Sequence, residues 1–224
     1  MGKFFRLESP LIQGLGKVTD LIVLNILTIL LSVPVITAGA ALTSLYDATW
    51  RIIQDEGVVY RSYFVSFKTN FKKSTLLWLI ILSTGIFLAL AAMFYRTKDM
   101  DIFAGVAYFA LILWAVTSAW VFPMQSRFEN PVMITLKNSL ICGISHLPRS
   151  AVISMLNLTP WFLLLYLTSL WVQLGLIWVM IWFSMSAFLS MKLLTKPFRK
   201  LMSIEAGKEE PEEMQGHNED QNQT

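Results

Sequence analysis

Charge is scarce in this sequence, and the shortage is concentrated in long stretches. Charged residues make up 15% of the 224 residues, and hydrophobic ones make up 55%, whereas soluble domains carry about 25% charged residues. No charged residue occurs from Ala151 to Met191. As a helix this run would extend roughly 60 Å, about twice the hydrocarbon thickness of a bilayer. It is therefore predicted to cross a membrane twice, with a reversal near residues 171–175.

Cysteine and histidine are also nearly absent. The single cysteine, Cys142, excludes an intramolecular disulfide framework. His146 follows it by four residues, but a zinc or nucleophilic site needs further ligands or a third partner. A phosphate-binding loop is missing, which excludes an ATPase, and no ionisable residue lies mid-span, which argues against ion-coupled transport. We therefore expect no enzyme, no catalytic residue, no metal and no cofactor.

The apolar stretches predict an all-α, polytopic membrane protein with about five transmembrane helices, in an integral membrane domain covering residues 1–200. The predicted spans are residues 21–42, 76–95, 102–124, 151–170 and 174–194, each near the ~20 residues needed to cross. Pro34 interrupts the first span, because proline lacks an N–H donor and disfavours helical geometry at the preceding residue. Two pictures stay open. In the first, the membrane helix ends near Pro34 and a surface helix follows from about Ala40 to Gln54. In the second, one kinked helix continues to about Leu42.

The distribution of Lys and Arg predicts the orientation. Thirteen of these residues lie on one predicted side of the membrane and five on the other, and basic loops stay in the cytoplasm. We expect a multi-pass protein of the bacterial cell membrane, with its amino terminus outside and its carboxyl terminus cytoplasmic. Residues 201–224 are acidic and have no apolar period, so they are expected to form a disordered cytoplasmic tail. Nucleic-acid binding is excluded, since no soluble domain exists to carry it.

A stripe of aromatic residues precedes the second span. The stripe runs from Tyr60 and Tyr63 through Phe64, Phe67 and Phe71, and Arg61 flanks it. Aromatic rings beside lysines are typical of a helix in the headgroup layer; packing beneath the helix bundle is the alternative. The candidate interfacial face consists of Phe64, Phe67, Lys68, Phe71, Lys72 and Lys73. A second amphipathic helix is predicted between Asn130–Pro131 and His146.

Two amides stand out inside the predicted spans, Asn25 and Asn157. Exposing an amide to lipid is costly, so both are expected to face the interior of the bundle. Hydrogen bonding between helices is the favoured role, and lining a path for a solute is the other.

An ordered set of short motifs resembles the YesL family of bacterial integral membrane proteins, a domain of unknown function. The motifs cover most of the chain up to about Lys200: Phe4-Phe5-x-Leu7-x-Ser9-Pro10, Asp20-Leu21, Pro34-x-x-Thr37-x-Gly39, Leu45-Tyr46, Phe64-x-x-Phe67-Lys68-x-Asn70-Phe71, Phe122-Pro123 and His146-Leu147-Pro148-Arg149. The resemblance implies a link to carbohydrate utilisation, because such genes commonly accompany components of sugar ABC transporters. It implies no catalytic residue.

Two functional hypotheses follow. The first is a non-enzymatic accessory or scaffold protein of carbohydrate uptake, whose partners are the lipid bilayer and subunits of a sugar ABC transporter. The alternative is a small uncoupled transporter or facilitator for sugars or oligosaccharides. An oligomer is compatible with either hypothesis.

Overall fold

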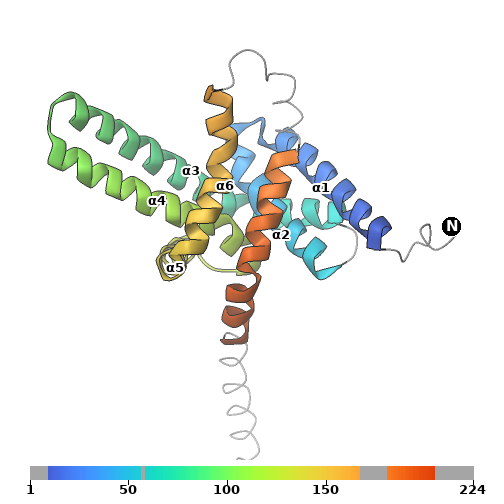
Figure 1. The fold of residues 1–224 in the computed structure, drawn as a ribbon. Helices are drawn as coiled ribbons and strands as arrows, with labels where there is room; N and C mark the ends of the chain where they lie inside the picture. Colours follow the sequence, from blue (N-terminus) through green and yellow to red (C-terminus); the bar gives the residue numbers. More distant parts are fainter. Residues whose placement is uncertain (1–9, 57–58, 167–180, 205–224) are drawn as a thin grey trace, which may run out of the picture. The chain divides into compact units, whose positions relative to one another are not determined.

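The described part of the chain is built entirely from helices. The structure, a computed structural model, describes residues 10–56, 59–166 and 181–204. No strand occurs among them, which confirms the predicted all-α class (Figure 1).

The chain divides into two compact units, residues 1–191 and 192–224. In the second unit residues 192–204 are helical. The first unit contains α1 (Pro10–Ser32), the short 3-10 helix η1 (Val35–Thr37), α2 (Ala38–Gln54), α3 (Val59–Thr97), α4 (Asp101–Arg127), α5 (Val132–Ser145), α6 (Leu147–Tyr166) and helical residues 181–191.

Several helices are suited to cross a membrane, so the chain is a multi-pass membrane protein. Three helical segments within the described residues are long and apolar enough, namely Gly14–Ser32, α3 and α4. The helices α5 and α6, bent by 110° relative to each other, make a fourth if the pair counts as one span. The fourth and fifth predicted spans, 151–170 and 174–194, lie partly outside the described residues. The predicted reversal near residues 171–175 and the tail beyond residue 204 lie wholly outside them.

The first predicted span is broken at its proline. The helix α1 ends at Ser32. The alternative in which the first helix ends near Pro34 is therefore correct, and the helix does not continue to Leu42. Beyond Pro34, the backbone N–H of Thr37 donates to the Pro34 carbonyl at 2.8 Å. The Thr37 hydroxyl also hydrogen-bonds the carbonyls of Leu31 and Pro34. These bonds satisfy backbone groups that the break would otherwise leave unpaired.

The helix that follows the break is buried, which corrects the predicted surface helix. Thirteen of the 17 residues of α2 are buried. The reason is the run of small residues at its start, which allows α3 to approach closely. A Cβ atom at Gly39 would clash with the backbone carbonyl of Ser74 and with the side chain of Trp78.

The predicted amphipathic loop and the second span form one helix. The helix α3 runs without interruption for 39 residues, about 58 Å. Beyond α3 the chain turns back at Asp99, which adopts a left-handed φ of 53°. The helices α3 and α4 then pair as a hairpin (Figure 1). Inside the hairpin the Trp114 indole N–H donates to the Ile81 carbonyl at 2.9 Å.

Candidate functional site

The two predicted intramembrane amides join different pairs of helices. Asn25 of α1 is fully buried, and its Oδ1 accepts a hydrogen bond of 2.9 Å from the backbone N–H of Ser184. Asn157 of α6 is half-buried and hydrogen-bonds the hydroxyl of Tyr46 in α2. The structure therefore places the two side chains at contacts between different helices and does not bring them together at one site.

The aromatic stripe of α3 is divided between two environments. Tyr63 is completely buried, and its hydroxyl donates to the Ala41 carbonyl at 3.3 Å and lies 3.2 Å from the hydroxyl of Thr28. Phe64 and Phe71 are exposed instead. Tyr63 thus follows the packing alternative, whereas the two exposed rings suit an interface.

The candidate basic and aromatic face lies on the exposed part of this stripe. Lys68, Lys72 and Lys73 are exposed, and the half-buried ring of Phe67 meets that of Phe71 edge-on, with centroids 5.6 Å apart. A shallow hollow of about 620 Å³ is lined by Phe67, Lys68, Thr69, Phe71, Lys72 and Lys73. Five of the six residues of the predicted face therefore line one surface depression.

A buried ion pair lies where α2 meets the end of α4. The carboxylate of Asp47 pairs with the guanidinium of Arg127, and the two side chains are only 6% and 15% exposed. The Arg127 guanidinium also lies over the Trp50 ring, 5.5 Å from its centroid. Asp47 accepts a second, longer contact from Arg51 at 3.4 Å. Because a buried charge is stable only when paired, this cluster fixes α2 against α4.

A chain of neutral polar side chains continues this layer across three helices. Gln125 of α4 is buried; its Nε2 donates to Asn70 Oδ1 at 3.2 Å, and its Oε1 accepts from the Thr135 hydroxyl at 3.2 Å. Asn70 belongs to α3 and Thr135 to α5. One amide thus ties α3, α4 and α5 to one another.

Neither cluster is evident from the sequence pattern. On a surface helix over residues 40–54, Asp47 and Arg51 would face water, and so would Arg127 in a loop after the third predicted span. One signal was available, since Asp47 is the first charged residue after Asp20 and sits inside an otherwise apolar stretch.

The pair Cys142 and His146 forms part of a packed helix end. The His146 Nδ1 lies 3.2 Å from the Cys142 carbonyl oxygen, and its ring lies 5.5 Å from that of Trp120. Within the described ranges, no group of three or more His, Cys, Asp or Glu side chains could hold a metal ion.

These observations define a class, an all-helical multi-pass membrane protein whose described polar groups fasten helices to one another. Residues 21–99 match the model of a protein family described as "Protein of unknown function, DUF624". This segment runs from α1 through the end of α3. No curated protein and no solved structure shows a significant match to the chain.

Proposed function

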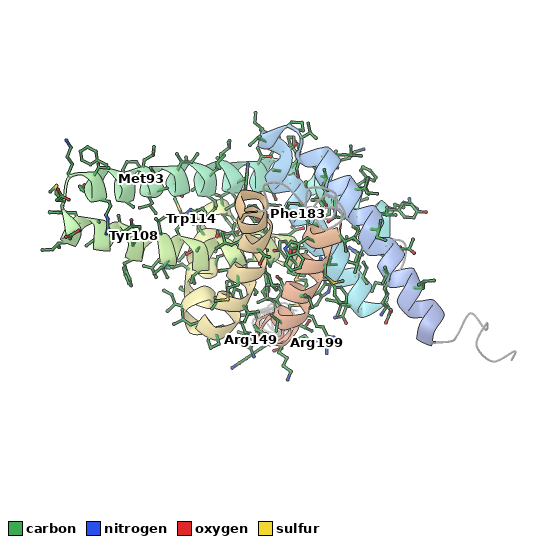
Figure 2. All side chains as sticks on the ribbon, turned by 45° about the horizontal axis from the view of Figure 1, so that its top comes forward. Met93, Tyr108, Trp114, Arg149, Phe183 and Arg199 are labelled. Carbon is green, nitrogen blue, oxygen red and sulfur yellow. The ribbon has the colours of Figure 1, made fainter. Side chains whose placement is uncertain are left out.

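We propose that this protein is a non-enzymatic accessory or scaffold component of the cell membrane that holds other membrane proteins through its helices. The observation that carries the proposal is the outer surface of the α3–α4 hairpin. Large apolar side chains there are exposed along both helices: Ile86, Phe87, Leu90, Met93, Phe94, Ile102, Phe103, Val106, Phe109 and Ile112. Figure 2 labels Met93 on α3 and Tyr108 and Trp114 on α4; Met93 and Tyr108 are exposed, whereas the Trp114 indole donates to the Ile81 carbonyl across the hairpin.

The hydrogen bonds of the polar residues support a scaffold function over a path for a solute. A solute path needs polar groups that face an opening. Here Asn25 bonds to Ser184 and Asn157 to Tyr46, so these amides are used in contacts between helices. The uncoupled sugar facilitator therefore stands second. Flux of sugars into vesicles containing only the folded protein would favour it over the scaffold.

The resemblance to the YesL family supports sugar transporter subunits as the partners. The excess of Lys and Arg supports a cytoplasmic location for the carboxyl terminus, the start of α3 and the loop after α4. In this orientation the hairpin crosses the membrane, and the Asp47–Arg127 pair lies toward the cytoplasm.

A site-specific crosslinking experiment tests the proposal. A photoreactive amino acid replaces Phe87, which is 71% exposed on the hairpin, or Met155, which is 69% exposed on α6. Illumination of sugar-grown cells is expected to join the Phe87 variant to a membrane-protein subunit of a sugar transporter. The matched Met155 variant should give a much weaker adduct. Adducts with lipid alone at both positions would overturn the scaffold function.

A further inference from the structure

The helices α1 and α2 run in opposite directions, side by side. Near the start of α1, the Lys17 Nζ lies 2.8 Å from Asp55 Oδ1, just beyond the end of α2. Near the end of α1, Thr28 meets the hydroxyl of Tyr63, which in turn bonds the carbonyl of Ala41 near the start of α2. The chain therefore goes out along α1 and returns along α2 to the level of Lys17.

Charged residues gather at the open end of this pair. A small hollow of about 150 Å³ is lined by Lys17, Asp20, Arg51, Ile52, Asp55, Glu56 and Val59. These residues come from the first half of α1, from the end of α2 and the two residues after it, and from the start of α3. Arg51 also approaches Glu56 at 4.0 Å. The three helix ends thus face the same aqueous compartment.

The closed end of the pair is apolar and exposed. No charged residue occurs from Leu21 to Tyr46. At the turn, Val33, Val35 and Ile36 are 73%, 59% and 60% exposed. A turn that emerges into water is normally polar, whereas this one presents aliphatic side chains and satisfies its broken backbone through Thr37. Such a turn is suited to hydrocarbon.

We infer that α1, η1 and α2 form a re-entrant hairpin, which enters the membrane from the cytoplasmic side, turns within the hydrocarbon at Pro34 and returns. The amino-terminal end of α1 then faces the same compartment as the start of α3. This differs from the outside location predicted by counting charges over five complete spans. The distribution of charge supports the hairpin, because it brings Lys3, Arg6 and Lys17 to the basic side. Only Arg96 and Lys98, two of the 18 basic residues, remain on the other side.

Single-cysteine labelling tests the inference in the full-length protein. The Cys142→Ser background removes the one native cysteine. Gly14→Cys reports the start of α1, where an added Cβ meets nothing within 4 Å. Lys68→Cys reports the basic half of α3, and Lys98→Cys reports the turn between α3 and α4. A membrane-impermeant maleimide is applied to intact spheroplasts and, separately, to permeabilised ones.

We expect Gly14→Cys and Lys68→Cys to react only after permeabilisation, and Lys98→Cys to react in both preparations. Labelling of Gly14→Cys together with Lys98→Cys in intact spheroplasts would overturn the inference. A fourth variant, Val35→Cys, separates a re-entrant hairpin from two complete crossings. It should resist the reagent in both preparations and react only after denaturation. Its labelling in intact spheroplasts would show that the turn emerges outside, which also overturns the re-entrant hairpin. Elution of each variant as a single peak in detergent confirms that it is folded.

Discussion

Removing one member of the Asp47–Arg127 pair should destabilise the protein far more than removing both. In the Asp47→Leu variant the guanidinium of Arg127, 15% exposed, loses its carboxylate. Breaking a buried pair in this way costs about 3–5 kcal/mol. The Trp50 ring 5.5 Å away retains the cation and offsets roughly 1–2 kcal/mol, so a loss of about 3 kcal/mol is expected. Arg127→Met strands a carboxylate that Arg51 still approaches, and about 3 kcal/mol is expected again.

The double variant Asp47→Leu/Arg127→Met removes both charges and leaves apolar side chains of similar volume. Replacing a whole buried pair is often neutral or stabilising, so its stability should lie within about 1 kcal/mol of the parent. Arg51→Met is the matched control. Its side chain is 39% exposed, and exposed ion pairs contribute about 0–1 kcal/mol.

The assay is unfolding of the protein in mixed micelles by increasing SDS, followed by tryptophan fluorescence. The free energy of unfolding is compared across the parent, the two single variants, the double variant and the control. Two results would refute the reasoning: single variants that cost no more than Arg51→Met, or a double variant whose loss equals the sum of the singles. Either result would mean that water reaches both charges freely.

Two further predictions use the same assay. Gly39→Ala should destabilise by about 1–3 kcal/mol, because its Cβ would clash with Ser74. Gly105→Ala, whose Cβ meets nothing within 4 Å, should stabilise by roughly 0.5–1 kcal/mol; equal effects at the two glycines would contradict the close approach of α2 to α3. Asn25→Leu should cost about 1–3 kcal/mol, because it removes the acceptor of the buried N–H of Ser184. An unchanged midpoint for Asn25→Leu would show that water or another group replaces the amide.

The sequence could predict where some helices begin and end. Pro34 predicted a break and the structure has one there, because the missing N–H and the steric restriction act on neighbouring residues only. The same holds for α5, which begins at Val132 after Pro131 and ends before His146. The predicted boundary between the amphipathic loop and the second span was wrong, because both belong to α3. No proline lies between Val59 and Thr97, and a change from charged to apolar residues alters the surroundings of a helix without ending it.

The buried clusters depend on contacts between distant residues, which a periodic pattern does not encode. On the predicted surface helix over residues 40–54, water would be the default partner of Asp47. In the structure α4 supplies Arg127 instead. Likewise Gln125 gained its role only when α3 and α5 brought Asn70 and Thr135 to it. The sequence singles out the amides Asn25 and Asn157, but it does not give their partners, Ser184 and Tyr46.

The unbroken helix α3 also has a mechanical consequence. Exposed side chains occur toward both of its ends, Lys68 in its first half and Met93 in its last turns. With no hinge between them, a twist applied at one end turns the other by nearly the same angle. A partner that grips the hairpin would therefore reorient the lysines on the far side without touching them.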